Sequence, residues 1–127
     1  MSAPAATFIY RLVKVRIVTE QPVELIDITN DVAALVCDVE MQDGFVHMQS
    51  RHVTTAIVLN EGDVLRIRPA ASLEVADGRL KLGKNERALL VESNGPEARE
   101  LSIILIGQGA AEEVLADRPT QWEGALQ

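Results

Sequence analysis

The feature that most constrains the fold is a series of short apolar and β-branched runs that follow one helical pattern. Polar turns of a few residues separate these runs. Connections this short join antiparallel strands, whereas parallel strands need long crossovers. The sequence therefore predicts an α+β domain, with antiparallel strands in a two-layer sandwich or partly closed barrel and one main helix. The expected strands after the helix are residues 45–50, 53–59, 64–68, 72–75, 79–82, 87–92 and 101–106.

Two elements precede this series. Residues 8–19 form a long β-branched run in which Arg11, Val13, Val15 and Ile17 share one face. The opposite face is more polar, so we expect it to meet solvent or another subunit. A short extended piece is expected at residues 23–28. The one main helix is expected at residues 30–41, capped by Thr29 or Asn30.

Three breaks divide the later strands. Arg51-His52 interrupts residues 44–63, which read as two strands and a polar turn. Asp77-Gly78 and the segment 93–96 are both hairpin signals. In the strand after the first break, the alternation places Thr55 in the core with Val53, Ile57 and Leu59. It places His52, Thr54 and Asn60 on the other face.

Length and composition favour one soluble domain. The chain has 127 residues and a net charge of −7, which disfavours nucleic acid and anionic membranes as partners. No apolar run is long enough for a membrane helix. One cysteine, Cys37, forms no internal disulfide, which favours a cytoplasmic location. We expect a domain at 1–107 and a C-terminal tail at 108–127, where a short helix and Trp122 would dock on the body or on a neighbour.

Both histidines, His47 and His52, lie in the segment 44–63. Five positions apart, they would lie on opposite faces of a continuous strand, and no further ligands are evident, so a transition-metal site is not favoured. His52 and Asn60 are eight peptide steps apart, roughly 26 Å when extended. His52 and Glu61 could act together as an acid–base pair only across two subunits. The plainer alternative is a histidine at the start of a strand and a glutamate in a solvated turn.

Six of the twelve basic residues fall within residues 66–87. Arg66 and Arg68 share one strand face, and Lys84 follows the late hairpin. A phosphate-bearing ligand would suit such a patch. The alternative is a solvated surface whose charges pair with nearby glutamates for little energy.

Residues 52–61, HVTTAIVLNE, resemble the hallmark of the YjbQ-like family, with His52, Asn60 and Glu61 at matching positions. Residues 26–29 resemble that family's entry into its helix. Residues 72–73 and 77–83 resemble its late hairpin. The chain departs from the family in two places. A long histidine-bearing segment after the Asn-Glu turn is missing, and Lys84-Asn85-Glu86 replaces the family's Thr-Trp-Gln.

The resemblance implies a homotrimer with strands in two layers and a secondary thiamine-phosphate synthase-like activity. Two functions stay open. In the first, a trimeric binding or structural module has lost part of the family site. In the second, a weak enzyme acts on small phosphorylated substrates between subunits, with magnesium as its cofactor if one is used. His52 and Glu61 would then be catalytic, and the ligand would be bound by Thr54, Asn60, Arg66, Arg68 and Lys84.

Overall fold

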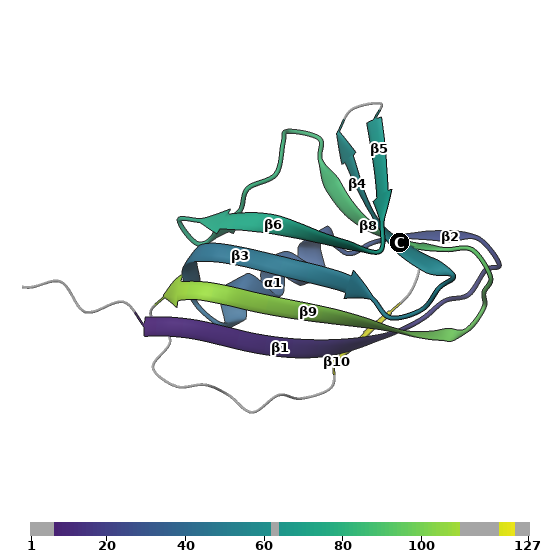
Figure 1. Cartoon of the computed structure of the whole chain (residues 1–127), viewed down its shortest axis with the longest axis horizontal. Coiled ribbons are helices and arrows are strands. Elements are labelled where there is room, and N and C mark those ends of the chain that lie inside the picture. The colour runs from purple at the N-terminus through teal and green to yellow at the C-terminus, as the bar shows by residue number, and fades with distance from the viewer. Residues whose placement is uncertain (1–6, 62–63, 110–119, 124–127) are drawn as a thin grey trace, which may run out of the picture.

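The computed structural model describes residues 7–61, 64–109 and 120–123. Its strands form two sheets (Figure 1). The six-stranded sheet contains β1 (Thr7–Val18), β3 (Met41–Ser50), β6 (Ala70–Ala76), β7 (Arg79–Leu80), β9 (Ala98–Gly109) and β10 (Thr120–Glu123), in the order β10-β1-β9-β3-β6-β7. The four-stranded sheet contains β2 (Glu24–Asp27), β4 (Thr55–Glu61), β5 (Val64–Arg68) and β8 (Arg87–Glu92), in the order β2-β8-β4-β5.

The predicted α+β class and two-layer arrangement are confirmed. Every described strand pair is antiparallel except β1 with β10. The single described helix is α1 (Thr29–Asp38), and its buried Val32 and Val36 join the core between the sheets. That core consists mainly of Val, Ile, Leu and Met side chains from both sheets. Burial of this apolar surface is the main force holding the layers together.

β1 matches its predicted faces. Arg11, Val13, Val15 and Ile17 are buried, and the residues between them are exposed or half-buried. The uncovered face carries Phe8 and Tyr10, which are 65% and 48% exposed. Along the sheet Tyr10 pairs with Ile106, which is half-buried and pairs with Phe45 on β3, so an apolar row on this face crosses three strands.

The helix begins and ends earlier than predicted. Ile28 occupies the cap position and makes no side-chain cap hydrogen bond, so capping by Thr29 or Asn30 was a wrong prediction. The Thr29 hydroxyl instead accepts a hydrogen bond from the Ala88 N–H at 2.8 Å, and Asp27 Oδ1 accepts one from the Thr29 N–H at 2.9 Å. At the other end Glu40 has a φ of 55°, and Met41 starts β3 as a buried core residue.

The predicted turns have mixed outcomes. Asp77 and Gly78 both have positive φ and connect β6 to β7 as a tight hairpin, as predicted. The predicted hairpin at residues 93–96 is wrong. The strands on either side do not pair, because β8 belongs to the four-stranded sheet and β9 to the six-stranded sheet. The turn there carries the chain from one layer to the other.

The predicted break at Arg51-His52 is a second crossing between layers. β3 ends at Ser50, residues 52–54 form a turn, and β4 begins at Thr55 in the other sheet. Thr55 and Ile57 are buried and Leu59 packs against the core, as predicted. Val53 is fully exposed, because it lies in the turn before the strand starts, so its predicted core position was wrong.

The tail contributes a strand to the main sheet. β10 pairs in parallel with β1, with the backbone of Trp122 opposite Ile17. The predicted short helix at residues 110–117 lies outside the described residues. Among the residues that the structure covers, no helix has the length and apolar character needed to cross a membrane.

Candidate functional site

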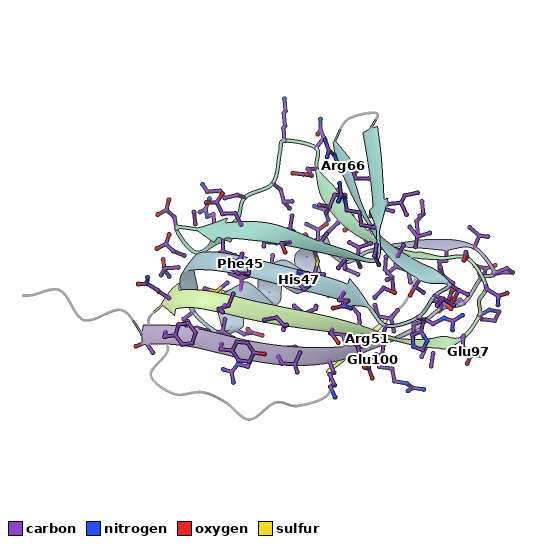
Figure 2. The ribbon with its side chains drawn as sticks, viewed as in Figure 1. Phe45, His47, Arg51, Arg66, Glu97 and Glu100 are labelled. Carbon is purple, nitrogen blue, oxygen red and sulfur yellow. The ribbon has the colours of Figure 1, made fainter. Side chains whose placement is uncertain are left out.

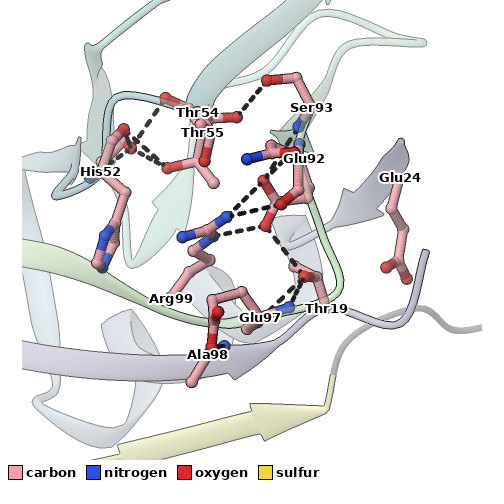
Figure 3. A network of polar contacts seen from close by, with 12 residues as sticks. Thr19, Glu24, His52, Thr54, Thr55, Glu92, Ser93, Glu97, Ala98 and Arg99 are labelled. Atoms are coloured by element: carbon pink, nitrogen blue, oxygen red, sulfur yellow. Dashed lines mark hydrogen bonds and ion pairs between the residues drawn. The ribbon is translucent and has the colours of Figure 1, made fainter. Parts of the chain in front are cut away.

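The turn at residues 51–54 fixes the backbone of His52. Its carbonyl oxygen accepts hydrogen bonds from the Ser50 hydroxyl at 3.1 Å and from the Thr55 N–H at 3.2 Å. The Thr55 hydroxyl also donates to this oxygen at 3.2 Å. These bonds hold the start of β4 and leave the exposed imidazole directed away from the network (Figure 3).

His52 lines a cavity of about 360 Å³, here called the His52 cavity. Its walls come from β1, from the start of β9 and from the 51–54 turn. Three of its charged side chains are basic and one is acidic. Its lining residues are Lys14, Val15, Arg16, His52, Ala98, Arg99 and Glu100.

One of these lining residues, Arg99, forms a buried ion pair with Glu92 (Figure 3). Glu92 is fully buried, and its Oε1 accepts hydrogen bonds from Arg99 Nε at 2.6 Å and from the Thr19 hydroxyl at 3.0 Å. Its Oε2 accepts from the N–H groups of Ser93 and Asn94, both at 3.1 Å. Burial alone would raise the pKa of the Glu92 carboxyl, but Arg99 and the other donors outweigh it and lower that pKa to about 2.

A second, larger cavity of about 580 Å³ lies where β5 approaches the edge of the six-stranded sheet, and it is here called the Arg66 cavity. Arg66 and Arg68 reach it from β5, and Lys81 reaches it from the segment after β7. Figure 2 shows His47 on the open face of β3 and Arg66 on the neighbouring β4–β5 hairpin. Glu74 and Glu86 are its acidic lining residues.

His47 and Ser72 face each other in the Arg66 cavity. They are direct cross-strand partners on β3 and β6, and His47 Nδ1 lies 2.9 Å from Ser72 Oγ. Reasoning from sequence considered His47 only as a metal ligand and passed over Ser72. No local signal could have joined them, because their contact depends on the register between strands 25 positions apart.

The predicted site residues do not gather in one place. His52 lines one cavity, whereas Arg66 and Arg68 line the other. Lys84 lines neither, and the buried Thr54 hydroxyl has no hydrogen-bond partner among the described residues.

Asn60 is part of the framework of the four-stranded sheet, since its Oδ1 accepts a hydrogen bond from the Arg87 N–H at 2.6 Å. Glu61 ends β4, and its side chain lies outside the part of the chain that the structure describes. The catalytic and ligand-binding roles of all these residues stay predictions. Over residues 7–60, 66–109, the side chains of His, Cys, Asp and Glu form no group of three or more that could hold a metal ion.

The fold and its cavities define a two-layer α+β protein in which basic residues gather at hollows. The chain carries a net charge of −7, yet six of its twelve basic residues line the two cavities. This placement favours anions as ligands in both hollows.

Comparisons with known proteins agree on one family. A family model described as UPF0047 protein YjbQ-like matches residues 13–68. A UPF0047 protein of Archaeoglobus fulgidus is 28% identical over 120 residues, an alignment that covers 67% of this chain and 93% of the relative. The alignment spans 120 residues, but 67% of this 127-residue chain is fewer residues than that. Part of the relative's aligned segment therefore has no counterpart in this chain. That difference agrees with the predicted shortening.

Solved structures share the fold. A YbjQ-like protein of unknown function from Sulfolobus solfataricus superposes with a TM-score of 0.72 at 22% identity, covering 80% of this chain and 99% of that one. A hypothetical protein from Aeropyrum pernix gives 0.69 at 22% identity, covering 76% and 98%. The family model and the curated relative agree with the YjbQ-like resemblance carried by residues 52–61, and the solved structures show that the fold is shared.

Proposed function

We propose that this YjbQ-like protein is a binding module for small phosphorylated ligands, which occupy the Arg66 cavity. The observation that carries this proposal is the convergence of Arg66, Arg68 and Lys81 on one hollow. An arginine guanidinium can donate two parallel hydrogen bonds to two oxygens of one phosphate, and lysine adds a compact positive charge. The whole chain has a net charge of −7, so three such cations around one cavity give that surface a local charge opposite in sign to that of the protein.

The proposed ligand contacts keep Arg66 and Arg68 of the five residues expected from the sequence and drop the other three. Lys81 takes the place that the sequence reading gave to Lys84, because Lys81 lines the cavity and Lys84 does not. Lys81 is positioned by its own backbone, whose N–H donates to the Glu74 carbonyl oxygen at 2.8 Å. Thr54 and Asn60 lie outside this cavity and are not needed by the proposal.

The test is a titration of the purified protein with pyrophosphate, in which binding is measured by isothermal calorimetry and by changes in amide chemical shifts. Arg66→Ala combined with Arg68→Ala is expected to weaken binding at least roughly tenfold, since two charge-assisted contacts are lost. Arg79→Ala is the matched control. It removes an exposed arginine of the same basic patch that lies outside the cavity. Equal weakening by both changes would refute the cavity as the binding site.

A second candidate function is a secondary thiamine-phosphate synthase-like enzyme, and the His52 cavity favours it. His52 opens into a hollow with Lys14, Arg16 and Arg99, which suits a phosphorylated substrate. Glu61, its expected partner, ends the same strand that His52 precedes, so cooperation would require a neighbouring subunit. His52→Ala should abolish such activity while leaving the melting temperature nearly unchanged. A fall of several degrees together with unchanged turnover would contradict this role.

We also propose the homotrimer that the family resemblance implies. Exposed Phe8, Tyr10 and Phe45 on the outer face of the six-stranded sheet support a protein–protein interface there. Light scattering on the eluting protein measures the mass directly. A mass equal to that of the monomer at every protein concentration would refute both the proposed trimer and any site shared between subunits. The cytoplasm, proposed from the single Cys37, is tested by fractionation.

A further inference from the structure

We infer that His47 and Ser72 are the specificity-determining pair of the Arg66 cavity and select dianionic phosphoryl or sulfuryl groups over monoanions. This inference rests on the proposed anion-binding function of that cavity. Both side chains line the hollow, on directly opposed positions of β3 and β6. The 2.9 Å contact between His47 Nδ1 and Ser72 Oγ fixes the two groups relative to each other.

The chemistry of this contact limits what the pair can present. If the Ser72 hydroxyl donates to Nδ1, then Nε2 carries the ring proton and donates outward. If Nδ1 carries the proton and donates to Ser72, the hydroxyl proton points outward and Nε2 becomes an acceptor. A neutral imidazole and a hydroxyl therefore offer an anion one outward donor in either tautomer.

Protonation of the ring changes this count. In the imidazolium form Nδ1–H donates to Ser72 Oγ, so both Nε2–H and the Ser72 O–H are free to donate outward. The pair then presents two donors and one added positive charge. A group with two negative charges and several acceptor oxygens gains more from this change than a group with one negative charge.

The surroundings of His47 set the field in which this happens. From β5 it is faced by Arg66 and Arg68, and from the segment after β7 by Lys81. From β6 and from the loop before β8 it is faced by the carboxyl groups of Glu74 and Glu86.

One of these acids is already engaged. Glu86 Oε1 accepts a hydrogen bond from the Gly83 N–H at 2.9 Å. On β9 the neighbour of His47 is the apolar Ile104, which adds no charge. Three cations and two carboxylates give the hollow a net positive charge. Protonation of His47 would add to that charge and strengthen the binding of a dianion.

The experiment compares sulfate with methanesulfonate at pH 8 and at pH 5.5, because sulfate keeps two negative charges and methanesulfonate one at both values, so only the charge on the protein changes. Calorimetry on the full chain is expected to show sulfate affinity rising roughly tenfold from pH 8 to pH 5.5, the effect of one added charge-assisted contact. Methanesulfonate affinity should change much less.

The chain has only two histidines, so the controls are complete. His47→Gln should abolish the pH dependence and the preference for sulfate, whereas the control Arg79→Ala, which lies outside both cavities, should retain both. His52→Gln is measured beside them, because His52 lines the other cation-lined cavity. Ser72→Ala should weaken sulfate binding at low pH and leave part of the pH dependence, since the ring still charges. Sulfate binding that is independent of pH, or whose pH dependence is lost with His52 instead of His47, overturns the inference. Absence of any sulfate or pyrophosphate binding instead overturns the proposed function beneath it.

Discussion

Replacing Arg99 by methionine should destabilise this protein far more than its place in the lining of a cavity implies. The change removes the cation that faces Glu92, whose side chain is fully buried. Three other donors remain on that carboxylate, from Thr19, Ser93 and Asn94. They satisfy its oxygens but leave its charge unneutralised in the interior. Breaking a buried ion pair from one side typically costs about 3–5 kcal/mol.

An independent route gives a similar magnitude. The pKa of Glu92 is lowered from its ordinary value of 4.5 to about 2 by its partners. A shift of this size corresponds to about 3 kcal/mol of stability. Because the folded-state pKa lies below the unfolded value, this contribution is fully present above pH 4.5. It is lost as the pH falls toward 2.

The assay is thermal and urea unfolding of four proteins: wild type, Arg99→Met, Glu92→Gln and the double variant. Arg99→Met should lower the melting temperature by roughly 10–20 °C for a domain of this size. Glu92→Gln should cost less, since Arg99 keeps its bond to the Asn94 carbonyl oxygen, and the double variant should recover much of the loss. The stability difference between wild type and Glu92→Gln should shrink between pH 4.5 and 2.

A matched control exists in the other described ion pair. Arg87 and Asp27 meet at 2.8 Å, but both side chains are 41% exposed. Solvent screens such a pair, so Arg87→Met should cost less than about 1 kcal/mol. If Arg99→Met were no more harmful than Arg87→Met, the reasoning from burial would be refuted.

Three further changes probe other parts of the fold. Gly107→Ala should cost about 3 kcal/mol in chemical unfolding, because its Cβ would lie 2.0 Å from the Asp43 carbonyl oxygen, whereas Gly83→Ala should be nearly neutral. Asn60→Ala should cost about 1–2 kcal/mol by leaving a backbone N–H of β8 without its acceptor, and Asn60→Asp should restore most of this loss. Phe45→Ser should reduce the mass of the assembly in light scattering without lowering the stability of the monomer, and an unchanged mass would place the interface elsewhere.

Local patterns were enough to predict most of the strands. The alternation from Arg11 to Ile17 identified the buried face of β1, because side chains in a strand alternate with period two whatever packs on them. Asp77-Gly78 identified its hairpin, because both residues tolerate the positive φ that such a turn requires. In each case the physical cause lies within a few residues of the signal.

Other features depend on contacts that the local sequence does not encode. The Thr29 hydroxyl bonds the Ala88 backbone, 59 positions away, so it does not cap its own helix. The Ser-Asn-Gly-Pro sequence at 93–96 does mark a turn, but not the sheet to which the chain goes next. The Arg66 cavity likewise depends on residues that are distant in the sequence. It forms because residues of β5 in one sheet and of β3 and β6 in the other line one hollow, and no spacing in the sequence records that arrangement.

The break after Ser50 has a functional consequence. If β3 continued unbroken, His47 and His52 would lie five positions apart on opposite faces of one strand. Instead the chain leaves the six-stranded sheet, so His47 stays on its open face and His52 enters the turn to the other layer. Each histidine thereby belongs to its own cation-lined cavity. Within one subunit the two histidines line separate cavities, so replacing either one reports on a single cavity. A property that depended on both histidines at once would require a second copy of the chain to bring the two cavities together.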